Sequence, residues 1–331
     1  MSSVLTLART GLFFLCMAGW WLWLHRRWEL PLALAPAVSF CSIGCVLYLA
    51  ALLNVLWPVQ VLLAGGLALL ARELFRGRLT ALRPLTCPAV AVYAAGCGWT
   101  VLLLRGALVQ GHDNFAHWAI MAKSLITNGQ LPNVANTAVE YVDYPPAAAL
   151  WIKFVCNAVG FSDGTMLMAQ GFLALACALA LGALCRTAPQ ALAAGGFCLL
   201  VFALGGAYGT LMVDGLLTLL ALAALATALR LRRDGRAARA VLFAAPILGF
   251  LAITKNSGVF LAVMTGALVL ALDGAKGSRL RGAAAAWGLP VLLWYLWGRH
   301  VRLVYPAGME SKHAVDASAY LENLTGKTGE E

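Results

Sequence analysis

The sequence predicts an all-α fold, a polytopic transmembrane helix bundle of about ten spans. Of its 331 residues, 62% are hydrophobic and only 11% are charged, whereas soluble domains average about 25% charged residues. The apolar residues form long runs that few charges interrupt, which is typical of membrane spans. Because lipid offers the backbone no hydrogen-bond partner, each span is expected to be a helix. The lipid bilayer is therefore the first predicted partner of this chain.

Ten apolar segments are the candidate spans. The first follows the N-terminus and lacks a small-residue cleavage site, so we interpret it as a retained span. Several segments are shorter than the roughly 20 residues that a straight span needs, so their ends are expected to extend into neighbouring loops. The segments cover residues 5–24, 31–53, 58–72, 86–104, 165–185, 191–207, 211–229, 240–254, 257–272 and 283–298.

The distribution of charge predicts the orientation. Alternate loops carry fifteen Lys and Arg residues against four acidic ones, and the opposite loops carry nine against ten. Loops rich in Lys and Arg remain in the cytoplasm, so both termini and the acidic loops are expected outside. This distribution also explains the formal net charge of +10 and argues against a nucleic-acid partner. The fifteen basic residues are Arg26, Arg27, Arg72, Arg76, Arg78, Arg83, Arg186, Arg230, Arg232, Arg233, Arg236, Arg239, Lys276, Arg279 and Arg281.

The apolar run 146–160 is an exception to the span assignment. If it crossed the membrane, every later loop would change side and the arginines at 230–239 would face outward. We therefore predict a helix lying in the outer interface, with Trp151 and Lys153 near the level of the headgroups. A tilted, buried helix remains the alternative. In either case residues 106–164 form one large outer loop, and loops of that size are usually functional or disordered.

This outer loop contains the densest group of polar side chains. Asp113 and His117 are four residues apart, so a helix would place them on one face. The alternative is that Asp113 caps an interfacial helix and His117 is its solvated neighbour. Asp143 precedes Tyr144 and two prolines, where it either serves a site or caps the next helix.

Two further ionisable residues fall at the outer ends of later spans. Asp214 lies near the outer end of the span 211–229, and Lys255 lies in the tight turn between the spans 240–254 and 257–272. Ionisable residues near the membrane are costly, which favours a functional role. The alternatives are a structural ion pair for Asp214 and a snorkelling interfacial anchor for Lys255. A carboxylate can take a proton from a hydroxyl nucleophile, and a lysine can bind a phosphate leaving group.

In the order of these pieces, the sequence resembles the GT-C superfamily of polytopic glycosyltransferases. This superfamily includes the protein O-mannosyltransferases and the lipid A aminoarabinose transferase, which use lipid-phosphate-linked sugars. The matching pieces are Asp113 with Trp118, Gly129-Gln130-Leu131-Pro132, Tyr144-Pro145-Pro146, Gly160-Phe161, Asp214 and Thr254-Lys255. The resemblance covers residues 86–300, a core of seven spans. Residues 1–85 would then be a three-helix N-terminal membrane extension, and residues 301–331 a polar outer tail.

The resemblance implies a role for each matched residue. Asp113 would be the base that activates an acceptor hydroxyl, and Lys255 would lie near the phosphate of a polyprenyl-phosphate-linked sugar. The acceptor would be an envelope glycan, lipid or protein, and the transfer would invert the anomeric carbon. The predicted substrate-binding residues are His117, Lys123, Asp143, Tyr144, Asp214, Lys255 and Asn256. No cofactor is expected, although a divalent cation between Asp113 and Asp143 is one possibility.

The chain departs from the family pattern at two places. Many relatives carry two adjacent acids in the first outer loop, and here the second position is Asn114. Relatives also commonly continue beyond the core, where this chain has the tail 301–331. Two other classes remain open, a transporter or lipid flippase and a non-catalytic assembly subunit. The Ala-, Leu- and Arg-rich composition favours a bacterial inner membrane, with the site on its periplasmic or extracellular side.

Overall fold

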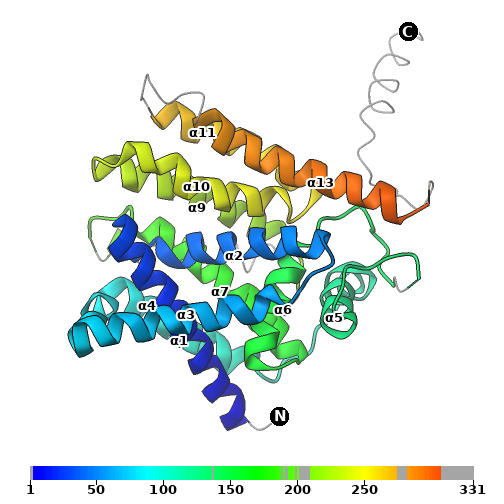
Figure 1. Cartoon of the computed structure of the whole chain (residues 1–331), viewed down its shortest axis with the longest axis horizontal. Coiled ribbons are helices and arrows are strands. Elements are labelled where there is room, and N and C mark those ends of the chain that lie inside the picture. Colours follow the sequence, from blue (N-terminus) through cyan, green and yellow to red (C-terminus); the bar gives the residue numbers. More distant parts are fainter. Residues whose placement is uncertain are drawn as a thin grey trace.

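The computed structural model describes residues 3–135, 138–187, 189–190, 193–197, 200, 209–273 and 282–306. Within these ranges every regular element is a helix and no strand occurs (Figure 1). The α-helices are α1 (Ser3–Trp28), α2 (Ala35–Leu52), α3 (Pro58–Gly77), α4 (Pro88–Leu104), α5 (Ala119–Asn128), α6 (Ala147–Val159), α7 (Asp163–Gly182), α9 (Asp214–Arg233), α10 (Ala237–Ala252), α11 (Asn256–Asp273) and α13 (Leu289–Val304). The 3-10 helix η1 (Arg78–Thr86) and the π-helices η2 (Asn114–Trp118) and η3 (Ala284–Gly288) complete them.

Five helices in this part of the chain are long and apolar enough to cross a membrane. They are Val4–Trp28, Ala35–Leu52, Pro58–Arg76, Asp163–Gly182 and Asp214–Arg233. The helices Pro88–Leu104, Arg239–Ala252 and Asn256–Leu272 are apolar but shorter. The all-α fold is thus confirmed, and the protein has several candidate membrane spans. The predicted span 191–207 lies mostly outside the described residues, and each other predicted span coincides with a helix.

The first three helices share one hydrophobic core with the rest of the chain. Helix α2 packs against α1, α6, α7 and α10, and it is largely buried. The hydroxyl of Tyr48 on α2 donates a hydrogen bond of 2.7 Å to the carbonyl of Leu293 on α13. Residues 3–85 are therefore part of the bundle wall, and the separate origin of 1–85 as an extension stays a prediction. The tail beyond Pro306 lies outside the described residues.

Helices α1 and α3 approach each other through glycines. A Cβ atom on Gly19 would lie 1.8 Å from the carbonyl oxygen of Gly66, and one on Gly66 would lie 2.2 Å from that of Cys16. Small residues allow helices to pack backbone against backbone where lipid gives no hydrophobic force between them. This contact fixes α3 on α1 and, through α1, on the core.

Helix α6 is buried in the protein, so Trp151 and Lys153 do not lie on a lipid-facing surface, and their level near the headgroups stays a prediction. Trp151 is 1% exposed and Lys153 is 6% exposed. The indole of Trp151 donates to the carbonyl of Ala169 at 2.7 Å, and the ammonium of Lys153 donates to that of Leu125 at 2.9 Å. Leu125 belongs to the last turn of α5, and its carbonyl accepts both this ammonium and, at 3.2 Å, the cap amide of Gly129. The burial of α6 agrees with the alternative of a buried helix, and its tilt in the membrane stays a prediction.

The charges separate to the two ends of the bundle. At the basic end, Arg26 pairs with Glu73, Arg239 donates to the carbonyl of Trp28, and Arg230 donates to that of Ala183. The acidic end contains the start of α9 at Asp214, the α10–α11 turn and the last turn of α13. Helix α9 has 20 residues and joins the two ends, which therefore lie about 30 Å apart.

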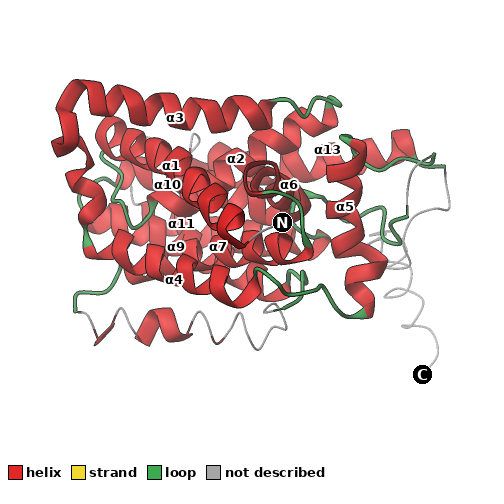
Figure 2. Ribbon diagram, turned by 90° about the horizontal axis from the view of Figure 1, so that it is seen from below, coloured by secondary structure: helices red, strands yellow, loops and turns green. Residues whose placement is uncertain are grey.

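The two views place α5 at the acidic end. Figures 1 and 2 both show α5 at the end of the bundle toward which α13 runs, away from the junction of α9 and α10. The hydroxyl of Tyr305, just after α13, donates a hydrogen bond of 2.8 Å to the carbonyl of Pro132, just after α5.

The arginines at 26, 230, 233, 236 and 239 gather at the opposite end of the bundle, as the sequence predicts. Lys276, Arg279 and Arg281 lie outside the described residues.

Candidate functional site

Polar and aromatic side chains from five segments converge at the acidic end. We call this group the acidic-end cluster. Its members come from η2, from the loop before α6, from the start of α9, from the α10–α11 turn and from α13. They are His117, Trp118, Asp143, Tyr144, Asp214, Lys255, Asn256 and Trp297.

A tight turn between α10 and α11 positions Lys255 and Asn256. The amide of Gly258 donates to the carbonyl of Lys255 at 2.8 Å. A Cβ atom on Gly258 would lie only 2.1 Å from the carbonyl oxygen of Leu251, so the turn needs glycine here. The amide of Ala147 donates to the carbonyl of Ile253 at 3.0 Å, which ties the start of α6 to the same turn. Two segments distant in sequence thus meet beside Lys255.

Asn114 joins the first part of the loop to the start of α9. Its side chain is buried, and its amide nitrogen donates to the carbonyl of Gln110. Its amide oxygen accepts a hydrogen bond of 2.9 Å from the backbone of Leu211. A carboxylate could accept from Leu211 but could not donate to Gln110. Asn114 therefore has a structural role in this chain.

Lys255 pairs with Asp214 above two aromatic rings. Its ammonium lies 2.7 Å from a carboxylate oxygen of Asp214. The same nitrogen lies 6.0 Å from the ring centre of Trp118 and 5.9 Å from that of Tyr144, at the outer limit of a cation–π contact. The side chain of Asp214 is about half exposed. This geometry matches the structural ion pair that we considered as the alternative role of Asp214. The ammonium of Lys255 nevertheless keeps two N–H donors for another partner.

Asp143 is held from two sides rather than capping α6. The side-chain amide of Asn256 donates to one carboxylate oxygen at 2.9 Å, and the indole of Trp297 donates to the backbone carbonyl at 2.7 Å. The residue at the N-cap of α6 is Pro146, so the capping interpretation of Asp143 is wrong. The other carboxylate oxygen of Asp143 is buried and has no hydrogen-bond partner among the described residues. A buried acceptor of this kind needs a hydrogen-bond partner from outside the described residues.

His117 is a buried neutral ring, not the solvated neighbour of Asp113. Its ring lies edge-on to Trp118 at 4.6 Å and to Tyr144 at 5.2 Å between centroids. Burial, and then the positive charge of Lys255, lower the pKa of His117 to about 3. The imidazole is therefore uncharged at neutral pH. Its Nδ1 atom is buried without a hydrogen-bond partner in the described part of the chain.

The negative charges of three carboxylates act on the hydroxyl of Tyr144. Burial raises the pKa of Tyr144, and the negative charges of Asp143, Asp214 and Asp113 raise it further. Asp113 thus lies within electrostatic range of the cluster. It occupies the N-cap position of η2, but its side chain makes no capping hydrogen bond. The carboxylate is about half exposed and lies 3.7 Å from the ring of His112, where it remains accessible to an incoming group.

Lys123, a predicted site residue, pairs away from the cluster. Its ammonium lies 3.0 Å from Asp163, the first residue of α7. Asp163 also accepts a hydrogen bond of 3.2 Å from the backbone of Val109, so it anchors the start of the loop. This is a structural ion pair that the sequence analysis did not anticipate. The preceding Ser162, which accepts from the amide of Thr165, was the local signal for a helix start there.

Trp297 is a cluster residue that sequence reasoning missed. It lies on α13, 154 residues after the carbonyl that it contacts, and no local pattern distinguishes it from other tryptophans in the predicted spans.

The described residues contain no group of side chains suited to bind a metal ion. Across the ranges that the structure describes, no three His, Cys, Asp or Glu side chains gather as metal ligands. A divalent cation between Asp113 and Asp143 stays a prediction.

The cluster combines flat rings, a lysine with free donors and buried polar atoms that have no partner in the described part of the chain. Sites of this composition hold a small ligand on apolar rings and orient it through a few polar atoms. Comparisons with protein-family models, with curated proteins and with solved structures found no match to this chain. The functional argument therefore depends on the geometry of the cluster.

Proposed function

We propose that the protein is a membrane glycosyltransferase that uses a polyprenyl-phosphate-linked sugar. One observation carries the proposal. The Asp214–Lys255 pair lies over the rings of Trp118 and Tyr144, beside buried polar atoms of His117 and Asp143 that have no partner among the described residues. The aromatic rings suit the apolar faces of a sugar, and the open polar atoms suit its hydroxyls.

In the proposed reaction Asp113 acts as the general base. Its carboxylate takes the proton from an acceptor hydroxyl, and that oxygen forms a bond to the anomeric carbon. The bond from that carbon to the phosphate oxygen breaks on the opposite face, and its electron pair leaves with the polyprenyl phosphate. The configuration of the anomeric carbon is thereby inverted.

Lys255 would stabilise the leaving phosphate. Its ion pair with Asp214 uses one of its three donors and fixes the direction of the ammonium. A fixed positive charge near a phosphate that gains negative charge stabilises the transition state more than the ground state. Asn256 and Trp297 hold Asp143, and they act as positioning residues rather than catalytic ones.

The proposal includes the membrane topology. About ten spans would cross a bacterial inner membrane, with the arginine-rich end in the cytoplasm and the acidic-end cluster on the periplasmic or extracellular face. The acceptor would be an envelope glycan, lipid or protein on that face. The separation of the two ends along α9 supports this sidedness.

The test compares envelope glycans and lipids by mass spectrometry in cells with and without the protein. A sugar residue should disappear without the protein and return with the wild type. Asp113→Asn should fold and insert normally yet fail to restore it, because loss of a general base slows transfer about 10²- to 10⁴-fold.

Glu140→Gln is the matched control, since Glu140 is an exposed carboxylate in the same loop. It should restore the sugar fully. Restoration by Asp113→Asn would remove Asp113 from the role of base. An unchanged set of glycans and lipids in cells lacking the protein would contradict glycosyl transfer itself.

A further inference from the structure

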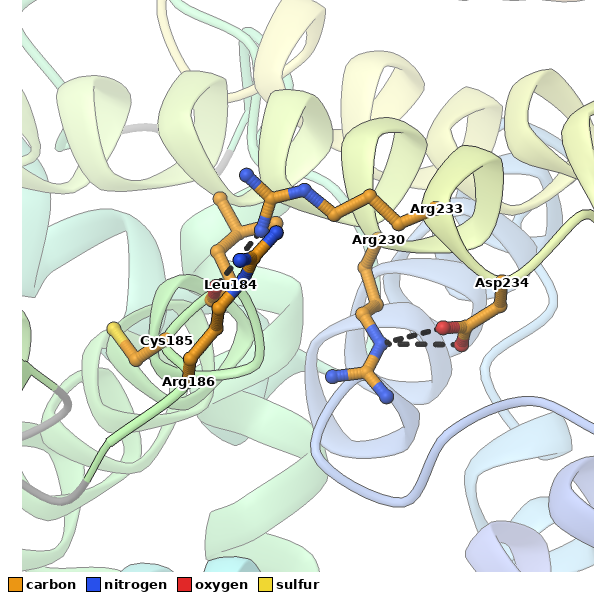
Figure 3. A pocket seen from close by; sticks show the side chains of 6 residues that line it. All are labelled: Leu184, Cys185, Arg186, Arg230, Arg233 and Asp234. Atoms are coloured by element: carbon orange, nitrogen blue, oxygen red, sulfur yellow. Dashed lines mark hydrogen bonds and ion pairs between the residues drawn. The ribbon is translucent and has the colours of Figure 1, made fainter.

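A charged hollow lies at the basic end, far from the acidic-end cluster. It has a volume of about 320 Å³, at the small end of ligand pockets in proteins. Figure 3 shows its six lining residues, which come from the segment after α7 and from the end of α9. They are Leu184, Cys185, Arg186, Arg230, Arg233 and Asp234.

Two of its arginines join α9 to α7. Arg230 donates a hydrogen bond of 2.7 Å to the carbonyl of Ala183, and Arg233 donates one of 2.8 Å to that of Leu184. These carbonyls belong to the C-terminal end of α7, where helical partners are missing. Each arginine uses a minority of its five N–H donors in this way. The walls of the hollow are thus fixed, while most of the donors remain available.

The positive charge in the hollow is only partly neutralised. Arg230 takes both carboxylate oxygens of Asp234, at 3.1 Å each, as the dashed lines in Figure 3 show. Among the described residues, no carboxylate lies within 4.0 Å of the guanidinium of Arg186 or Arg233. Two exposed guanidinium groups therefore line the same hollow without a negative partner in that part of the chain.

We propose that this hollow binds a phosphate group through Arg186 and Arg233. Guanidinium groups bind phosphate with paired N–H donors, and a rigid frame fixes their spacing. The group can come from the headgroup of an anionic phospholipid or from free inorganic phosphate. Basic pockets at the cytoplasmic level of membrane helices are suited to lipid headgroups, which would link α7 and α9 to that leaflet. This inference is independent of the proposed sugar transfer.

The test measures binding to the full-length protein in detergent with three probes. These are dioctanoyl phosphatidylglycerol, dioctanoyl phosphatidylcholine and inorganic phosphate, each titrated by thermophoresis. Saturable binding of either anionic probe should weaken about thirtyfold in the variant Arg186→Gln/Arg233→Gln, given the usual contribution of each basic residue near a membrane. Arg186→Gln alone should weaken it about fivefold. This single variant leaves the contacts of Arg230 and Arg233 with the end of α7 intact. It therefore tests the proposal even if the double variant fails to fold.

The matched control is Arg72→Gln/Arg76→Gln, because both arginines are exposed on α3 toward the basic end. It should bind as the wild type does. Tighter binding of phosphatidylglycerol than of inorganic phosphate would identify a lipid headgroup as the source, and the reverse order would identify the free ion. Equal losses in the control and hollow variants, or binding of the zwitterionic lipid as tight as that of both anions, would overturn the proposal.

Discussion

The two ends of the bundle use charge in opposite ways. At the basic end several arginines contact the protein itself, since they bind backbone carbonyls or pair with Glu29, Glu73 and Asp234. Arg186 and Arg233 in the hollow differ from these, because no described carboxylate lies within 4.0 Å of either.

At the acidic end, buried polar atoms of His117, Asp143 and His300 have no hydrogen-bond partner among the described residues. The paired arginines tie helices together, whereas the acidic end offers buried polar atoms to the ligand that we propose. The contrast implies that substitution of a paired arginine such as Arg26 mainly changes stability, and that substitution of the proposed base Asp113 mainly changes function.

The largest expected effect on stability tests the basic end. Arg26→Met leaves the carboxylate of Glu73, whose side chain is 8% exposed, buried without its partner. The free energy of unfolding should fall by about 3 kcal/mol, the low end of the range for a broken buried pair, because Arg26 is itself partly exposed. Denaturant unfolding in detergent micelles measures this change.

Arg27→Met is the control for that substitution. Arg27 is the exposed neighbour whose guanidinium lies 5.2 Å from the ring centre of Trp28. It should cost about 1 kcal/mol or less. If both variants lose the same stability, the Arg26–Glu73 pair contributes nothing specific and the contrast between the ends weakens.

A pH titration tests the acidic end. His117 has a folded pKa of about 3 against an ordinary value of 6.5. Because the folded state resists protonation, its stability is fully present above pH 6.5 and is lost as the pH falls from 6.5 toward 3. At pH 5 the loss due to His117 should be about 2 kcal/mol. His117→Gln should remove this part of the pH dependence, which unfolding curves at pH 7 and pH 5 measure. Equal pH dependence in the variant and the wild type would place His117 in a more solvated site.

The smallest expected effect concerns the Lys255–Asp214 pair. Its side chains are 22% and 48% exposed, so solvent screens the attraction. A double-mutant cycle with Lys255→Met and Asp214→Asn should give a coupling of about 0.5 kcal/mol in the free energy of unfolding. A coupling above about 2 kcal/mol would identify the pair as a structural lock and weaken the functional interpretation of the acidic end.

Much of the acidic-end cluster was predictable because it depends on sidedness. Asp143, Tyr144, Asp214, Lys255 and Asn256 were expected on one side from the count of charges in the loops, and the bundle brings them into contact. Knowing the side of the membrane on which a residue lies does not tell how close it lies to other residues on that side, however. Lys123 was therefore assigned to the site, although it pairs with Asp163 at the start of α7.

The burial of α6 was not predictable from its own residues. A 13-residue apolar helix with a lysine in its middle suggested a surface position. Its lysine is tolerated inside because α5, from another part of the chain, ends where its carbonyls can accept the ammonium. The contact of Trp297 with Asp143 depends in the same way on tertiary packing. The local sequence pattern predicts that a segment is a helix. How deeply that helix is buried depends on the contacts and hydrogen-bond acceptors that neighbouring helices provide.

The placement of the two ends on opposite sides of the membrane is the central claim, and site-directed labelling tests it most directly. Single cysteines would replace His112, whose side chain is 86% exposed, and the exposed Arg76, in a background without the native cysteines. A membrane-impermeant maleimide applied to intact cells should label the cysteine at position 112 and leave that at position 76 unlabelled until the membrane is permeabilised. Labelling of both positions in intact cells, or of position 76 alone, would contradict the account.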